Sequence, residues 1–319
     1  MNKRDLFHKK LWAVVLCLVL VLSVGVMAEE VVDRYDQIFD ASQDIGRLTA
    51  RFIKLTTRSD EKSGDCTILT SPDGEVMVID AGNPSTFIDV DRALKALGIT
   101  RIDYLVASHP HVDHIGSFAQ LIYSYEIGGV YTTELEYPTS HYNNYMEAVQ
   151  KTETPHIILA EGDTFMFGDS VLVEIFHPAP GIEYYDGYPA QSTQFINNHS
   201  MVMKLTFKDS TFLFGGDLYT SGEKEVLARY GERLQADVFK VGHHGDSTSS
   251  SKGWRNAISA KVAVMMHDAI ADLNVYRKYR REGTDTYITS IDGCVLVYTE
   301  GDGEYNVITQ YDRVSSFLD

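Results

Sequence analysis

Residues 104–118, YLVASHPHVDHIGSF, place three histidines and an aspartate within six positions, directly after an apolar run. His109 and His111 are one residue apart, so in extended backbone their side chains point to the same side and can hold one ion. Asp113 and His114 follow where the chain turns into a predicted helix, and they can face a second ion. Neutral imidazole and carboxylate suit zinc, with manganese or iron as alternatives when oxygen ligands increase. The stretch therefore predicts a site for divalent metal ions.

Strand-like runs rich in Val, Ile, Thr and aromatic residues recur along the chain, bounded by Gly, Asp, Asn or Pro. Helix-like periodicity appears between them, for example over residues 86–98, where Gly98 is a stop signal, and over residues 142–151. Strands dominate and neighbouring strands look like hairpins. This order favours two sheets with helices outside over one doubly wound parallel sheet.

Further chemically capable side chains follow predicted strands directly. Asp80 follows EVMVI, Asp217 follows TFLFGG, and His243 and His244 follow ADVFKVG. Strand ends are where a rigid scaffold presents functional loops. These four residues therefore join the histidine stretch as candidates for the functional site.

The H-x-H-x-D-H stretch, with Asp80 in VIDAG, Asp217 in FGGD and His244 in GHHG, resembles the metallo-β-lactamase superfamily. The resemblance implies a four-layer αββα sandwich over residues 29–319. It also implies that Asp217 bridges two ions, while Asp80 supports the ligands from behind without binding metal. The resemblance implies two divalent ions, with Zn expected and Mn or Fe as alternatives. Their implied ligands are His109, His111, Asp113, His114, Asp217 and His244.

Three further segments are similar to the ComEC/Rec2-like branch and to the related secreted phosphorylcholine esterases. They read NNHSMVMKLTFKDSTFLFGGD (197–217), KVGHHG (240–245) and TYITSIDGCVLVYTEGDG (286–303). The branch usually continues the double-histidine motif with serine, and here Asp246 takes that place.

The N-N-x-S motif of this branch leaves one ligand position open. Other superfamily members place a third histidine on the first ion, whereas this branch often carries only the motif's asparagine. Here His199 is either that third ligand or the variable residue of the motif, and Asn198 is expected to support the site from behind. His243 either contacts the substrate or a metal ligand, or it is only a loop histidine.

The resemblance implies metal-dependent hydrolysis. Two ions about 3.5 to 4 Å apart, bridged by Asp217, would share a hydroxide that attacks phosphorus or a carbonyl. Asp113 would also orient this hydroxide, and the second ion or His243 would stabilise the leaving oxygen. We expect a phosphodiester or phosphoester substrate, small or at the cell surface. The alternatives are a ComEC-like extracellular nuclease, a lactone or β-lactam hydrolase, and a binding module that has lost catalysis.

Two tyrosine-rich segments with interleaved acids, residues 123–148 and 181–195, bear on the substrate. They can form a wall that holds a cationic head group such as phosphocholine, or they can simply cover the loop side of a sheet. Removing residues 1–28 moves the formal charge from -17 to -17 - 3 = -20. This charge, with no Lys or Arg cluster near the motifs, disfavours nucleic acid as the partner.

Residues 1–28 have the plan of a signal peptide, with four basic residues, an apolar run over 11–26 and small residues around Ala28. An uncleaved membrane anchor is the alternative. Either way, residues 29–319 are expected to be secreted or extracytoplasmic. Cys66 and Cys294 remain in that part and can form one bridge or stay as two buried thiols.

Overall fold

The computed structural model describes residues 32–57 and 61–313, and the expected signal peptide at residues 1–28 lies outside these ranges. The described residues from Asp33 onward form one compact unit. Within the described part of the chain, no helix combines the length and the apolar character needed to cross a membrane.

The first sheet has eight strands in the order β17-β16-β1-β2-β3-β5-β7-β8. Its strands are β1 (Leu48–Phe52), β2 (Thr67–Thr70), β3 (Val76–Ile79), β5 (Tyr104–Val106), β7 (Val130–Thr132), β8 (His156–Ile158), β16 (Val295–Thr299) and β17 (Asn306–Thr309). Pairing is antiparallel from β17 to β3 and parallel from β3 to β8. A short parallel pair, β4 (Arg101–Ile102) and β6 (Glu126–Ile127), lies apart from it.

The second sheet has seven strands in the order β15-β14-β13-β12-β11-β10-β9. Its strands are β9 (Thr164–Phe167), β10 (Val171–His177), β11 (Val202–Phe207), β12 (Ser210–Phe214), β13 (Val238–Lys240), β14 (Val262–Met265) and β15 (Asp285–Ile288). Its first four strands in sequence pair antiparallel, whereas β12 to β15 run parallel. The parallel strands therefore end at one edge, where their following loops gather.

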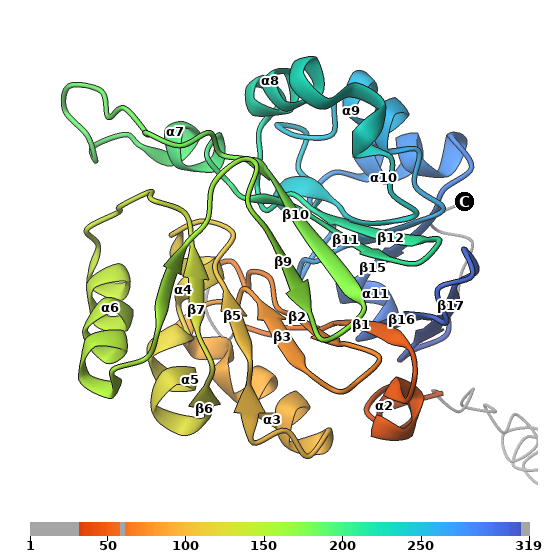
Figure 1. Ribbon diagram of the computed structural model, residues 1–319. Coiled ribbons are helices and arrows are strands. Elements are labelled where there is room, and N and C mark those ends of the chain that lie inside the picture. The colour runs from red at the N-terminus through yellow and green to blue at the C-terminus, as the bar shows by residue number, and fades with distance from the viewer. Residues whose placement is uncertain (1–31, 58–60, 314–319) are drawn as a thin grey trace, which may run out of the picture. The chain divides into compact units, whose positions relative to one another are not determined.

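Helices cover the outer face of each sheet, and a core of apolar side chains fills the space between the sheets (Figure 1). Against the first sheet pack α3 (Phe87–Ala96), α5 (Phe118–Ser124) and α6 (Ser140–Thr152); against the second pack α8 (Thr220–Tyr230), α9 (Lys252–Ile258) and α10 (Leu273–Arg281). The predicted arrangement of two sheets with helices outside is confirmed. The remaining helical segments are α2 (Tyr35–Ile38), α4 (Val112–Ile115), α7 (Thr193–Asn197), α11 (Thr289–Asp292), η1 (Ala41–Asp44), η2 (Pro84–Thr86), η3 (Gly231–Leu234) and η4 (Gly242–Gly245).

Local signals set several element ends. The Thr139 side chain accepts a hydrogen bond from the backbone of Tyr142 and so caps the start of α6. Helix α10 was not predicted from its sequence, although the Asp272 side chain caps it in the same way. Residues 51–57 have the composition of a strand, yet β1 ends at Phe52, because residues 48–52 are the ones that pair with β16 and β2.

The two cysteines flank the end of β1 from opposite sides. Cys66 accepts a backbone hydrogen bond from Ile53, and the backbone of Lys54 lies 3.4 Å from the Cys294 sulfur. Two strand spacings, roughly 9 to 10 Å, therefore separate the cysteine Cα atoms, whereas a disulfide needs less than about 7 Å. Both thiols are buried and free.

Candidate metal centre

The candidate residues gather where loops from the two sheets meet. Asp80 follows β3 and His109 follows β5 in the first sheet, whereas Asp217 follows β12 and His244 follows β13 in the second. All four side chains are buried. The structure thus brings residues from both halves of the chain into one cluster.

Close backbone packing places the loop before β2 against helix α4. His111 starts α4, and its backbone oxygen accepts from His114 and Ile115. A Cβ atom at Gly64 would overlap the backbone oxygen of Asp113, and Gly64 has a φ of +83°. Only glycine fits there without a shift of the chain. The close contact between the two backbones lets Asp65 donate its backbone N–H to the backbone oxygen of Asp113. It also brings the Asp65 carboxylate into the cluster.

The inner nitrogens of the histidines surround one carboxylate oxygen, Oδ2 of Asp217. His114 Nε2 and His244 Nε2 each lie 3.2 Å from it, and His109 Nε2 lies 3.9 Å from it. His111 presents Nδ1, which lies 3.0 Å from His109 Nε2. The geometry places Asp217 centrally among the imidazoles.

Acceptors behind the rings of His114 and His109 fix which nitrogen carries the proton. Asp80 Oδ2 lies 2.8 Å from His114 Nδ1, and a carboxylate can only accept, so His114 Nδ1 donates. Ser108 donates its hydroxyl to Asp80 and therefore accepts from His109 Nδ1, 3.1 Å away. Both rings are left with the lone pair of Nε2 directed inward.

His244 is held in the same way by a residue that the motifs did not indicate. Its Nδ1 lies 3.0 Å from Asp65 Oδ1 and 3.2 Å from the Met266 backbone oxygen, both of which are acceptors. Its Nε2 has no hydrogen-bond partner within the described part of the chain and lies 3.3 Å from Asp113 Oδ2. A lone pair facing two carboxylates requires a cation or a proton between them. The donor set therefore fits divalent metal ions.

The charged environment shifts the histidine pKa values in two directions. Burial lowers the pKa of His109 well below its ordinary value and that of His111 to about 4. Burial acts in the same direction on His114, but Asp217, Asp80 and Asp113 outweigh it and raise its pKa to about 10. Burial likewise opposes protonation of His244, yet Asp217 and Asp65 raise its pKa well above the usual value. Without metal, these two rings take up protons where cations would otherwise sit.

Four buried residues, Asp65, His114, Asp217 and His244, have potential ligand atoms within 4.8 Å of one another. Asp65 was not predicted because it comes just before a strand, whereas the predicted site residues all follow strands. Lys240, also not predicted, forms an ion pair with Asp65 inside the cluster. An acid beside a glycine at the start of a buried strand was the available signal for Asp65.

The structure does not bring His199 and Asn198 to the cluster. His199 Nδ1 lies 2.7 Å from the Phe195 backbone oxygen, and its ring packs on Phe195 and His177. The Asn198 side chain accepts from Gly222 N at 3.1 Å and so caps α8. Among the described residues, neither makes a hydrogen bond or ring contact with the clustered histidines.

Asn197 faces the cavity instead. It is 1% exposed, it is one of the residues that line the cavity, and its Oδ1 has no hydrogen-bond partner among the described residues. An unpaired buried amide oxygen is costly, so it is suited to a ligand from the cavity side. The N-N-x-S motif thus supplies Asn197 to the cavity, one position before Asn198, the residue that was expected to support the site.

His243 lies beside the cluster in a left-handed backbone conformation, with a φ of +47°. Thr248 donates its hydroxyl to Asp246 at 2.8 Å and accepts from His243 Nδ1 at 2.6 Å. His243 Nε2 is therefore an acceptor; it lies 3.9 Å from Asp217 Oδ2 and 3.4 Å from Lys62 Nζ. Asp246, the departure from the ComEC-like pattern, thus orients His243 through Thr248.

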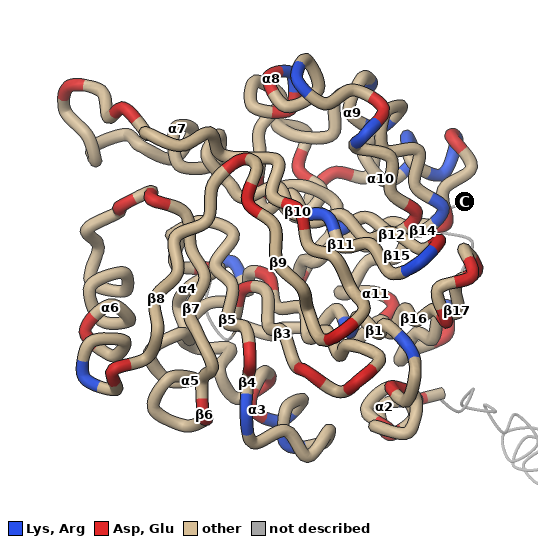
Figure 2. The backbone as a smooth tube through the Cα atoms, in the orientation of Figure 1, with Lys and Arg blue, Asp and Glu red and all other residues tan. Residues whose placement is uncertain are grey.

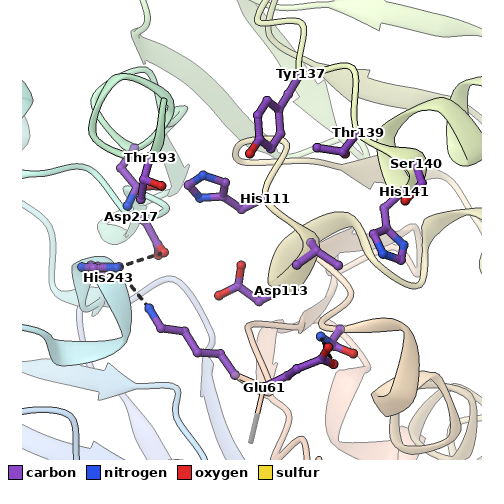
Figure 3. Close-up of a pocket in the computed structure, with 14 residues that line it drawn as sticks. Glu61, His111, Asp113, Tyr137, Thr139, Ser140, His141, Thr193, Asp217 and His243 are labelled. Atoms are coloured by element: carbon purple, nitrogen blue, oxygen red, sulfur yellow. Dashed lines mark hydrogen bonds and ion pairs between the residues drawn. The ribbon is translucent and has the colours of Figure 1, made fainter. Parts of the chain in front are cut away.

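A cavity of about 570 Å³ opens onto the cluster. In Figure 3, His111, Asp113, Asp217 and His243 converge from different elements on its floor, and Tyr137 stands above them. The first tyrosine-rich segment lines the cavity through Tyr137 and its neighbours 139–141, whereas the second contributes Thr193 and none of its tyrosines. The tyrosines of residues 184–188 instead pack on one another and on Phe195.

Comparisons with known proteins agree with this geometry. Residues 59–182 match the family model of the metallo-beta-lactamase superfamily. The chain is similar to competence protein ComA of Neisseria gonorrhoeae (30% identity) and to ComE operon protein 3 of Bacillus subtilis (25% identity). Each similarity extends over 172 residues, 54% of this chain and 21% of the relative, so the chain spans about a fifth of those relatives' length.

Among solved structures, CmlA, a diiron beta-hydroxylase from Streptomyces venezuelae, is 12% identical with a TM-score of 0.46, over 82% of this chain and 54% of that one. The family match defines the class of the matched part: residues 59–182 carry a metallo-beta-lactamase superfamily domain, and the chain has curated relatives in the ComEC-like branch. Together with the buried ligand group, this supports a metallohydrolase.

Proposed function

We propose that the protein is a secreted hydrolase that uses two divalent metal ions to cleave a phosphodiester or phosphoester. Zinc is the metal that we expect in preference to Mn or Fe. The observation that carries the proposal is the inward direction of the imidazole lone pairs around Asp217 at the floor of an open cavity. When bound, such ions polarise the reacting group and lower the pKa of water. We assign His109 and His111 to one ion, and Asp113, His114 and His244 to the other.

The residues around the ions would position the substrate and move a proton. Lys62 lies next to His243 at the cavity wall and can donate to phosphoryl oxygens. Burial lowers the pKa of His243, which keeps the ring neutral near pH 7. Its Nε2 can accept a proton from the attacking water and return it to the leaving oxygen. Asp113 faces the same space and can orient that water (Figure 3).

A small or cell-envelope substrate is favoured over a long nucleic acid. Figure 2 shows acidic residues on the two loops that flank α7 and α6, residues 134–136 and 183–186, next to the cavity residue Tyr137. Such a rim repels a polyanion but suits an ester with a cationic group such as phosphocholine. A ComEC-like extracellular nuclease, which the resemblance of the sequence motifs implies, is the second candidate.

The first test combines metal analysis with turnover. Purified protein prepared without chelators is analysed for metals per chain and assayed on bis-p-nitrophenyl phosphate. Asp217→Asn should lose more than about 100-fold in turnover, beyond the loss expected for an outer partner. Asp209→Asn, on an exposed turn, is the matched control. Metal near zero after reconstitution, with no turnover, would leave a non-catalytic binding module.

Substrate comparison then separates the candidates. The same metal-loaded sample is assayed on p-nitrophenyl phosphorylcholine, on single- and double-stranded DNA, and on a lactone and a β-lactam. Faster turnover of the phosphorylcholine ester supports the proposal, whereas faster cleavage of DNA supports the nuclease. Activity confined to the carbonyl substrates contradicts both.

A further inference from the structure

Lys240 is a lysine in an unusual place, the buried end of β13. It is 3% exposed, and fully buried lysines are rare unless they are paired. Val238, two residues earlier, packs in the core between the sheets, whereas Phe239 packs under the helices of the second sheet. Because side chains alternate along a strand, Lys240 points with Val238 into the space between the two sheets.

The ammonium group of Lys240 connects loops from both sheets. It donates to the Gly216 backbone oxygen at 3.0 Å and lies 3.5 Å from Asp217 Oδ1, both on the loop after β12. It also forms an ion pair with Asp65 Oδ2, on the loop before β2 in the first sheet. Asp65 in turn holds His244 through its other oxygen. A single cation therefore fixes two carboxylates and, through one of them, a histidine.

The charges of the cluster explain why a fixed cation is needed. Asp65, Asp80, Asp113 and Asp217 bring -4, and Lys240 brings +1, so the group carries -4 + 1 = -3 when its imidazoles are neutral. Two divalent ions would add +4. Buried charges without partners are strongly destabilising. When the ions are absent, protons on His114 and His244 offset part of this charge, and Lys240 supplies a cation that does not depend on the imidazoles.

We propose that Lys240 is a positioning residue that assembles the ligand group before metal binds. It holds Asp65 against His244 and occupies the outer oxygen of Asp217, which leaves Asp217 Oδ2 facing the imidazoles. The inference rests on the proposed function, because the side chains that Lys240 arranges are those assigned to the ions.

The test compares the thermal unfolding of the full chain with zinc and after removal of metal by chelation. Lys240→Met keeps most of the length of the side chain and removes its charge. It should lower the Tm of the metal-free protein by roughly 6 to 15 °C, and that of the zinc form by about half as much or less. The smaller effect is expected because bound ions neutralise the same carboxylates. Lys204→Met is the control, since Lys204 is half-buried on β11 and bonds the Arg233 backbone oxygen.

The outcomes separate this inference from the proposed function. One outcome is that zinc stabilises the wild type while Lys240→Met lowers the Tm of the metal-free and the zinc-loaded protein equally. In that case Lys240 is only a structural residue, and this inference is overturned while the proposed function stands. If zinc neither binds nor stabilises the wild type, both are overturned. A variant that folds only with zinc supports the inference.

A double variant covers the case in which Lys240→Met does not fold under either condition. Asp65→Asn combined with Lys240→Met removes both partners of the ion pair and so relieves the unpaired charge. We expect the double variant to be soluble and to unfold at a higher temperature than the single variant. A double variant that is no more soluble and unfolds at no higher temperature than Lys240→Met overturns the inference.

Discussion

Replacing Asp80 by asparagine tests how the cluster directs its lone pairs. Asp80 is 2% exposed and adopts a φ of +58° at the end of β3. It accepts from the backbone N–H of Ser108 at 2.8 Å and from the Ser108 hydroxyl at 2.7 Å, and it lies 2.8 Å from His114 Nδ1. All three groups donate to one carboxylate. An amide of the same shape retains one oxygen acceptor and presents N–H groups in place of the other.

The magnitude follows from the contact that the amide cannot make. Losing one hydrogen bond to a charged group costs about 1.5 to 3 kcal/mol of folding free energy. The amide N–H would face His114 Nδ1–H, and the ring can relieve this clash by moving its proton to Nε2. That proton would occupy the lone pair directed at Asp217. Losing an outer partner of this kind weakens metal affinity by roughly 10- to 100-fold.

Two measurements on Asp80→Asn check the reasoning: urea unfolding of the metal-free protein and competition for zinc against a chromophoric chelator. Asp237→Asn is the control, because Asp237 is also buried and hydrogen-bonded, to Thr211 and Tyr305, outside the cluster. We expect both variants to lose stability but only Asp80→Asn to lose zinc affinity. Unchanged zinc affinity in Asp80→Asn, despite lower stability, would refute the orienting role.

Three further outcomes follow from the structure. Asn198→Ala should remove a helix cap and cost about 1 kcal/mol in urea unfolding while the metal content stays unchanged. The pKa of His114 is raised to about 10 in the folded metal-free protein, so the stability it contributes is complete below about pH 6.5 and is lost as the pH rises to 10. Urea unfolding across this range should show that decline without metal, and zinc should suppress it. Thiol labelling without reductant should leave Cys66 and Cys294 unmodified in native protein and label both after denaturation.

The sequence was sufficient for the features that depend on local pattern. Residues 109–114 combine a strand end, a tight turn and four ligand-type side chains, and no distant contact is needed to read them. Helices such as α3 and α6 could be predicted because their apolar periodicity and end signals are local. Asp217 and His244 were found because family motifs mark them, although their distance from His114 could not be read from the sequence.

Residues whose role depends on the packing of one sheet against the other could not be found in this way. Lys240 lies in an apolar strand, where a single lysine reads as an edge or surface position, and its partner Asp65 is 175 positions away. Asn197 and Asn198 are neighbours, yet one lines the cavity and the other caps α8, because α7 ends between them. What separates them is the direction of a side chain at a helix end, and no spacing rule gives that direction. The cluster therefore combines ligands that the motifs indicate with a supporting cation whose role depends on the contact between the two sheets: the motif KVGHHG contains Lys240, but only the ion pair with Asp65 shows what Lys240 does.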